Sequence, residues 1–330
     1  MKSIVIYYSM TGNTKRIAEA IHAGMSQSGY KCEIVSLKEV NIQRLFDYDL
    51  IGLGSYVDDF QEPASVTDFI KNMPSLRGKY GFTFCTHGTC PGQYIARMVR
   101  SLRRKGLIIT GWNDWYGSVF LPFLAQPYYT DGHPDHIDLE EAMNFGKEIL
   151  ERSRRISEGE THLIPRLPRK EKYNKRYGDL SVLDDLNVVP GFESERLTQE
   201  DMKVLKPRLN VEKCKYPKCT ICVDNCPTQS IHPSQSPPIN HDTCRPCSLW
   251  FCEQLCPTGA IEVNWEPIIR TEKLRKVLFN WLAEPMKKYK DLRHFRSLIS
   301  PEEEGRDKPL YKINKHPRII LRDGVARVRK

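Results

Sequence analysis

Eight closely spaced cysteines constrain this chain more than any other feature. The chain has 330 residues and eleven cysteines, and eight of these lie in one segment that runs from Cys214 to Cys256. The sequence starts with Met1-Lys2-Ser3 and passes straight into a short strand-like run, without a signal-peptide pattern, so we expect a cytoplasmic protein. Thiols stay reduced in that compartment, and dense cysteines there indicate metal or cluster ligands rather than disulfides.

The eight cysteines form two sets of four with similar spacing. The sets read Cys214-x4-Cys219-x2-Cys222-x3-Cys226-Pro and Cys244-x2-Cys247-x4-Cys252-x3-Cys256-Pro. Each set resembles the bacterial ferredoxin pattern C-x2-C-x2-C-x3-C-P, with one gap widened by two residues. The resemblance implies two [4Fe–4S] clusters with crossed ligands, because the fourth cysteine of each run binds the other cluster. One cluster would then be held by Cys214, Cys219, Cys222 and Cys256, and the other by Cys244, Cys247, Cys252 and Cys226.

An internal repeat supports this interpretation. The segment from Cys226 to Ile231 matches the segment from Cys256 to Ile261 in residue type at equal offsets. We therefore expect two pseudo-symmetric halves, with Ile231 and Ile261 packed against the clusters. Two alternatives remain: a pair of structural zinc sites, since eight thiolates also satisfy two tetrahedra, and a plant-type [2Fe–2S] site on the first set, which leaves the second set unexplained.

The N-terminal part alternates strand and helix patterns. Short apolar runs predict strands, and amphipathic segments between them predict helices. The third run is apolar throughout, as expected for a strand that is covered on both faces. This alternation predicts a doubly wound parallel sheet. The expected strands are residues 2–8, 32–37, 49–56, 81–86 and 107–110, and the expected helices are residues 14–28, 66–73, 94–105 and 139–155.

A hydroxyl-rich loop between the first strand and the first helix predicts a phosphate site. Backbone N–H groups, side-chain hydroxyls and a helix N-terminus together can cradle a phosphate. The loop lacks the Gly-Lys-Ser/Thr of a Walker A sequence and the G-x-G-x-x-G of a dinucleotide site. It consists of Ser9, Met10, Thr11, Gly12, Asn13 and Thr14.

This hexapeptide is similar to the S/T-x-T-G-N-T loop of flavodoxins. The resemblance implies an FMN-binding α/β domain whose five strands follow the order 2-1-3-4-5, and it implies that these six residues hold the FMN phosphate. Two further loops, after the third and fourth strands, would then contact the flavin ring, with Tyr56 as the candidate to stack on it. Their candidate residues are Gly54, Ser55, Tyr56, Thr86, His87 and Gly88. His87 is either a tuning or proton-relaying residue or a solvated polar side chain.

The two motifs define the expected domain organisation. We expect a flavodoxin-like domain at residues 1–158, a linker at 159–208, a small α+β ferredoxin-like domain at 209–266 and a basic extension at 267–330. The aromatic stretch at 112–136 is either a lid or a domain seam, or it fills the core. No apolar run approaches the roughly 18 residues needed to span a bilayer. The net charge of +9 comes from dispersed basic residues, so we expect a solvated basic surface and no nucleic-acid partner.

The combination resembles flavodoxin–ferredoxin fusion proteins and implies electron transfer. Clusters exchange single electrons, whereas FMN exchanges one or two, so together they would connect one-electron and two-electron carriers. We expect redox partner proteins as donor and acceptor. The basic C-terminal region is either a docking surface for an acidic partner or a helix that covers the flank of the ferredoxin-like domain with its basic side in water. The main alternative is an FMN-dependent reductase of a small organic substrate that the clusters refill. The third possible function is redox sensing or nucleic-acid binding, but the sequence has no basic motif with interspersed aromatic residues to support it.

Overall fold

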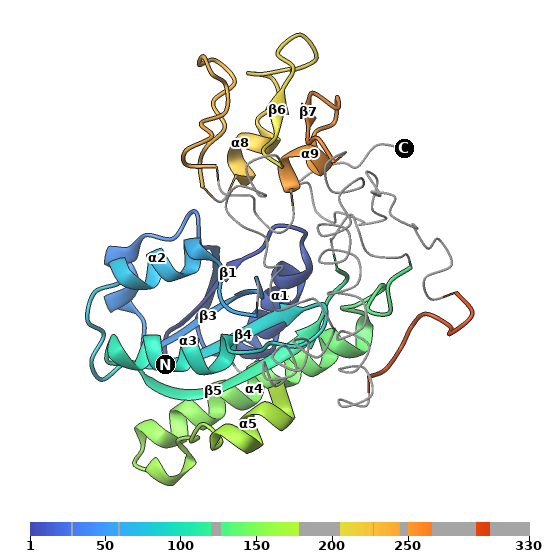
Figure 1. The fold of residues 1–330 in the computed structure, drawn as a ribbon. Helices are drawn as coiled ribbons and strands as arrows, with labels where there is room; N and C mark the ends of the chain where they lie inside the picture. Colours follow the sequence, from blue (N-terminus) through green and yellow to red (C-terminus); the bar gives the residue numbers. More distant parts are fainter. Residues whose placement is uncertain are drawn as a thin grey trace. The chain divides into compact units, whose positions relative to one another are not determined.

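The protein divides into two compact units. The first unit comprises Met1–Val119 and Thr130–Asp179, and the second comprises Phe120–Tyr129 and Leu180–Lys330. The structure, a computed structural model, describes residues 1–27, 29–58, 60–119, 127–177, 205–226, 228–244, 250–265 and 295–303 (Figure 1). Among these residues, no helix combines the length and apolarity that crossing a membrane would require.

The first unit contains a five-stranded parallel sheet in the order β2-β1-β3-β4-β5, which confirms the predicted order. Its strands are β1 (Ser3–Tyr8), β2 (Cys32–Ser36), β3 (Leu50–Tyr56), β4 (Tyr80–His87) and β5 (Ile108–Tyr116). Its helices are α1 (Asn13–Ser26), α2 (Ala64–Asn72), α3 (Tyr94–Arg104), α4 (His136–Ser157) and α5 (Lys170–Tyr177), with short 3-10 turns η1 (Ile42–Asp47) and η2 (Thr161–Leu163). Since all five strands are parallel, their carboxyl ends meet at one edge of the sheet.

The main core lies where α1 and α4 pack together against the sheet. Apolar residues of α1 and α4, among them Phe145, meet buried side chains of β1 and β4 such as Val5 and Phe82. The two helices approach closely because each has a glycine where it meets the backbone of the other, Gly24 on α1 and Gly146 on α4. A Cβ on Gly24 would lie 1.9 Å from the Met143 carbonyl oxygen. α2 and α3 cover the other face of the sheet (Figure 1).

The second unit contains a small fold with internal pseudo-symmetry. β6 (Arg208–Leu209) pairs antiparallel with β7 (Ile261–Glu262), and an isolated antiparallel bridge joins Ile231 and Ile239. Two short helices, α8 (Ile221–Asn225) and α9 (Phe251–Leu255), lie between them in sequence. Ile231, Ile239 and Ile261 form its buried centre, and cysteines pack against that centre.

Several sequence expectations meet the structure only in part. The expected linker at 159–208 starts with ordered structure, because η2 and α5 lie within the first unit. In the aromatic stretch, Trp115 and Tyr129 are buried, as core residues would be. The helix expected after Thr198, the amphipathic helix at 271–282, the terminal hairpin and the basic docking region beyond residue 303 lie outside the described residues.

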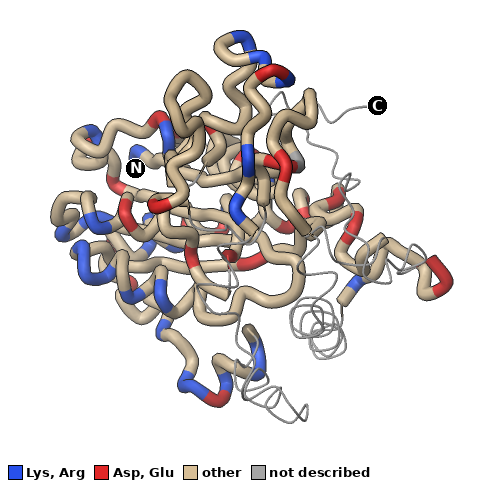
Figure 2. The backbone as a smooth tube through the Cα atoms, turned by 45° about the horizontal axis from the view of Figure 1, so that its top comes forward, with Lys and Arg blue, Asp and Glu red and all other residues tan. Residues whose placement is uncertain are grey.

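Charged residues of both signs occur along the described chain. Lys and Arg positions occur throughout it and are interspersed with Asp and Glu (Figure 2). Many form short-range ion pairs on helices, such as Arg154 with Glu151 and Lys71 with Asp68. On α3 (Tyr94–Arg104), four arginines occur without an acidic residue.

Candidate functional site

The loop between β1 and α1 presents a helix N-terminus without a side-chain cap. Gly12 occupies the position before α1 with a left-handed φ of 91°, and no side chain in the described residues caps the helix. The Gly12 N–H donates to Ser9 Oγ over 3.1 Å, which folds the loop back on itself. The first N–H groups of a helix have no partner within the helix, and they carry a partial positive charge. Such N–H groups can bind an anion.

Two side chains of this loop are already engaged with neighbouring elements. Thr14 Oγ1 lies 2.8 Å from Thr86 Oγ1, and both hydroxyls are buried. Asn13 donates from Nδ2 to the Ser118 carbonyl over 3.3 Å. These contacts connect the loop to the carboxyl ends of β4 and β5. Of the six loop candidates, Ser9, Thr11 and Asn13 remain partly exposed, whereas Met10, Gly12 and Thr14 are buried.

The structure brings the phosphate-loop candidate Met10 next to the ring-loop candidate Tyr56. The Tyr56 hydroxyl donates to Met10 Sδ over 3.1 Å, and the Tyr56 ring stacks on Tyr8 with centroids 5.7 Å apart. Tyr56 is only partly buried. Its ring is thus held by two residues of the β1 region while part of it stays accessible.

Tyr94, which sequence reasoning missed, fixes the end of β3. Its side chain is fully buried, and its hydroxyl accepts from the Ser55 N–H over 2.9 Å and donates to the Phe84 carbonyl over 3.1 Å. Burial raises the pKa of Tyr94, so the hydroxyl stays protonated. Ser55 itself is buried, and its hydroxyl donates to Tyr56 O. A tyrosine in the first turn of an amphipathic helix gives no signal of this role in the sequence.

His87 and Asp114 form a buried pair at the carboxyl ends of β4 and β5. His87 Nε2 lies 2.9 Å from Asp114 Oδ2, and the side chains are only 1% and 6% exposed. The Tyr116 ring meets the His87 ring edge-on, with centroids 4.7 Å apart. His87 is therefore buried, and it is not the solvated polar side chain that the sequence left open as one of two possibilities. Gly88 follows directly, and a Cβ there would lie 1.8 Å from Val119 Cγ2, so the loop needs glycine at this position.

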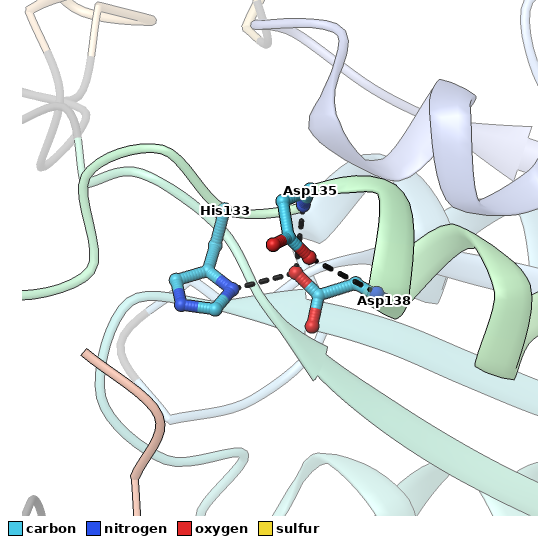
Figure 3. A group of neighbouring side chains, drawn as sticks. All are labelled: His133, Asp135 and Asp138. Atoms are coloured by element: carbon cyan, nitrogen blue, oxygen red, sulfur yellow. Dashed lines mark hydrogen bonds and ion pairs between the residues drawn. The ribbon is translucent and has the colours of Figure 1, made fainter. Parts of the chain in front are cut away.

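A second histidine–aspartate group lies at the start of α4 (Figure 3). His133 Nδ1 lies 2.6 Å from Asp138 Oδ2, which also accepts from the Asp135 N–H over 2.8 Å. Asp135 Oδ1 accepts in return from the N–H groups of Ile137 and Asp138. Three potential metal ligands thus lie close together. The carboxylates of Asp135 and Asp138 form the capping box of α4, and this box accounts for the positions of the two aspartates.

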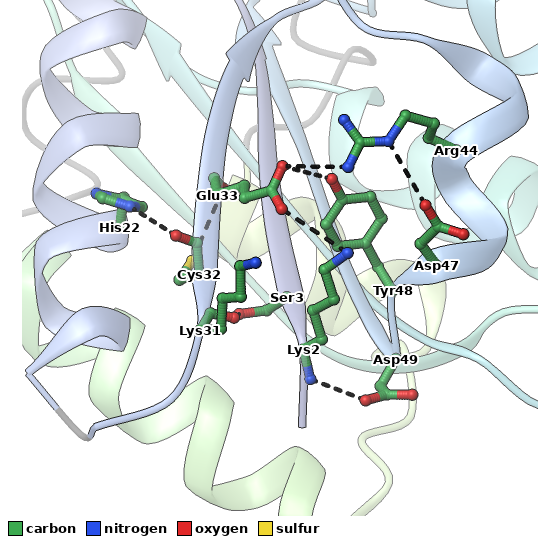
Figure 4. Close-up of polar contacts among 10 residues, drawn as sticks. All are labelled: Lys2, Ser3, His22, Lys31, Cys32, Glu33, Arg44, Asp47, Tyr48 and Asp49. Carbon is green, nitrogen blue, oxygen red and sulfur yellow. Dashed lines mark hydrogen bonds and ion pairs between the residues drawn. The ribbon is translucent and has the colours of Figure 1, made fainter.

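The opposite, amino edge of the sheet carries a separate polar network (Figure 4). The Tyr48 hydroxyl donates to Glu33 Oε2 over 2.6 Å, and Lys2 and Arg44 lie near the same carboxylate. The Tyr48 hydrogen bond is the largest cause that lowers the pKa of Glu33. Burial and then Glu33 raise the pKa of Tyr48 to about 12. This network ties β1, β2 and η1 together, away from the candidate site.

In the second unit, Cys222 lies among the cysteines that the crossed pattern assigns to one cluster. Burial raises the pKa of the Cys222 thiol to about 12, and the charges of Cys256, Cys214 and Cys219 add to this shift in that order. Cys256 belongs to the other sequence run, yet its charge adds more to the pKa shift of Cys222 than the charge of Cys214 or Cys219 does. Cys226, Cys244 and Cys252 pack with Cys222 and Cys256 around the isoleucine core, while Cys247 lies outside the described residues. The described cysteines form no disulfide.

The fourth cysteines of the two runs have equivalent surroundings. Cys226 and Cys256 directly follow α8 and α9, and their Sγ atoms accept backbone N–H bonds from Ser230 over 3.3 Å and Ala260 over 3.1 Å. Burial opposes ionisation of Cys256, but hydrogen bonds from Thr258 and from nearby N–H groups outweigh it and lower its pKa. Such donors stabilise a thiolate, the form that binds metal.

A further element of the repeat escaped sequence reasoning. Asn210 Oδ1 accepts from the N–H of Glu212, and Asn240 Oδ1 accepts from the N–H of Asp242. Each asparagine opens the turn that leads to the first cysteine of its run. The two positions stand at the same offset from each other as Cys226 and Cys256, so a comparison of the runs beyond their cysteines would have found them.

The comparisons with known proteins concern the N-terminal region. Residues 4–107 match the model of a family described as "Flavodoxin domain". The flavodoxin of Clostridium beijerinckii is 24% identical over 148 residues, which cover 44% of this chain and 96% of that protein. The flavodoxin of Megasphaera elsdenii is 26% identical over 110 residues, covering 32% of this chain and 80% of that one.

Among solved structures, an archaeal flavodoxin is 23% identical, with a TM-score of 0.38, and the match covers 47% of this chain and 99% of that one. The family match ends before the cysteine segment, which is therefore interpreted from its own residues. The family match and the parallel sheet in the order β2-β1-β3-β4-β5 agree, and the N-terminal unit of this chain is a flavodoxin-like domain.

Proposed function

We propose that this protein transfers electrons between an FMN bound to the first unit and two [4Fe–4S] clusters held by the second. The observation that carries the proposal is the packing of cysteines from both runs around one isoleucine centre: Cys222, Cys226, Cys244, Cys252 and Cys256. That grouping draws on both cysteine runs, as ligation of two neighbouring cubanes requires and two independent zinc ribbons do not.

The residues of the first unit fit FMN. The uncapped N-terminus of α1, next to Gly12 and Ser9, offers N–H donors to a phosphate without a lysine. The partly exposed Tyr56 ring would stack on the flavin, and the loop that begins with Thr86, His87 and Gly88 would line its other side. FMN supplies one-electron and two-electron chemistry when bound; the protein binds it, orients it and limits its access to water.

The residues of the second unit fit two cubanes. Eight thiolates occupy every protein ligand position of two [4Fe–4S] clusters, so no iron stays open for a substrate. Backbone N–H donors at Cys226 and Cys256 stabilise the thiolate form. The second unit would therefore relay single electrons. Tethering it to the flavin site keeps the redox centres at high effective concentration for each other.

Anaerobic purification with joint assay of iron, sulfide and FMN tests this proposal. We expect roughly eight iron and eight sulfide atoms with one FMN per chain. Cys256→Ala should lose iron and keep FMN, because Cys256 belongs to the second unit alone. Cys32→Ala is the matched control: this thiol lies on β2, at a distance from the cysteine runs in sequence, and should keep both. Zinc in place of iron, or full iron in Cys256→Ala, would refute the cluster assignment.

The buried His87–Asp114 pair favours a second function, the reduction of a small organic molecule at FMN. A carboxylate bonded to one ring nitrogen fixes the tautomer of the histidine, and the pair stands where ring-binding loops leave the sheet. A reductase should show saturable turnover with one substrate and lose most of it in Asp114→Asn. An electron carrier should be reoxidised by proteins or artificial acceptors and show no such saturation.

A further inference from the structure

α5 lies in the segment expected to be a linker and yet has a buried face. Its sequence is strongly polar, but Tyr173 and Tyr177 are only 4% and 1% exposed. They stand one helical turn apart, and their rings contact each other with centroids 4.7 Å apart. α5 lies well beyond residue 107, where the flavodoxin family match ends. A short helix of this composition would not be stable alone, so its contacts with the first unit hold it in place.

Both tyrosines bond to the segment that connects β4 to α3. The Tyr173 hydroxyl donates to the Gly92 carbonyl over 3.0 Å and accepts from the Ala96 N–H over 3.0 Å. The Gly92 N–H donates to the Tyr177 carbonyl over 3.0 Å. The Tyr177 hydroxyl accepts from Trp112 Nε1 over 2.8 Å. Burial raises the pKa of Tyr173, so its hydroxyl remains a donor at neutral pH.

The same segment is held from its other side by the loop after β3. Gly92 has a left-handed φ of 51°, and a Cβ there would lie 2.6 Å from Phe60 Cβ. The neighbouring Gln93 N–H donates to the Phe60 carbonyl over 2.9 Å. The β4–α3 segment is thus fixed between Phe60 and α5, and the two loops expected to face the flavin are coupled through Gly92 and Gln93.

We propose that α5 is a brace that fixes the loop at residues 88–92 in its flavin-binding position, with Tyr173 as the positioning residue. The inference rests on the proposed binding of FMN to the first unit. A loop that must be ordered when a ligand binds costs affinity, and a loop that is fixed beforehand does not. Tyr173 removes that cost through its hydroxyl, without touching the flavin itself.

Tyr173→Phe in the full chain tests the brace, and Tyr177→Phe is the matched control. Both variants lose one buried hydroxyl on the same helix, but Tyr173→Phe loses the bonds to Gly92 and Ala96, whereas Tyr177→Phe loses the bond from Trp112. We expect the FMN dissociation constant to rise about tenfold in Tyr173→Phe and less than twofold in Tyr177→Phe. Hydrogen exchange of peptides that contain residues 88–96, measured without FMN, should quicken in Tyr173→Phe alone.

The outcomes separate the inference from the proposed function. Equal weakening of FMN binding by both variants would show that α5 acts only through general stability and would overturn the brace. Unchanged FMN affinity in Tyr173→Phe would overturn it as well, while the FMN site would stand. If the purified wild-type chain did not bind FMN at all, the proposed function and the brace would fail together.

Discussion

Replacement of Tyr94 by phenylalanine would test how the end of β3 is held. The side chain is fully buried, and its hydroxyl accepts from the Ser55 N–H and donates to the Phe84 carbonyl. The Ser55 hydroxyl keeps its bond to Tyr56 O in the variant, so the main loss is a buried N–H left without its partner. A group of this kind costs about 1–3 kcal/mol, and the bond to Phe84 adds about 1 kcal/mol. We expect a loss of about 2–4 kcal/mol of stability in the first unit.

Native-state hydrogen exchange is the suitable assay, since a chain with two units need not unfold in a single step. Peptides from β3 and β4 report the opening free energy of the first unit alone. Tyr30→Phe serves as the control, because that ring is 37% exposed and its loss should stay within about 0.5 kcal/mol. A change below about 1 kcal/mol in Tyr94→Phe would refute the reasoning that this hydroxyl satisfies the end of β3.

Three further outcomes follow from the described contacts. In protein stripped of metal, Cys256 should be alkylated at a lower pH than Cys222, because hydrogen bonds lower the pKa of Cys256 whereas burial raises that of Cys222 to about 12; mass spectrometry across pH 7–9 would measure the order. Gly24→Ala should cost about 2–3 kcal/mol in chemical denaturation, because its Cβ would meet the rigid backbone of Met143. Asp135→Ala should cost about 1 kcal/mol by the same measurement, through loss of the α4 capping box.

The sequence was sufficient for features that depend on local pattern. Strand runs separated by amphipathic helices predicted the parallel sheet, since parallel strands need crossover helices and buried strands need continuous apolar runs. The hydroxyl-rich loop lies between β1 and α1, as its residues indicated, because glycine and short polar residues suit a turn that opens a helix. The repeat around Cys226 and Cys256 predicted two equivalent turns, and the structure contains both.

Features that depend on strand register or on packing between distant segments could not be predicted from the sequence. Asp114 meets His87 because β4 and β5 pair His87 with Tyr116, a register that no local pattern specifies. α5 resembles a linker in its composition because only two of its side chains are buried, and both are tyrosines among charged residues. In the sequence pattern, Tyr94 is indistinguishable from the other apolar positions of α3. In each case the partner lies far away in sequence.

The crossed grouping of the cysteines has a consequence for biosynthesis. Cys256 is the last cysteine in the sequence, yet it packs with Cys222 of the first run around the same isoleucine centre. In the proposed crossed arrangement, the site of Cys214, Cys219, Cys222 and Cys256 would stay one ligand short until the ribosome has released the whole segment. Iron and sulfide would then have to reach that site late, and a chain truncated before Cys256 would leave it incomplete, although all four ligands of the other site would already be present.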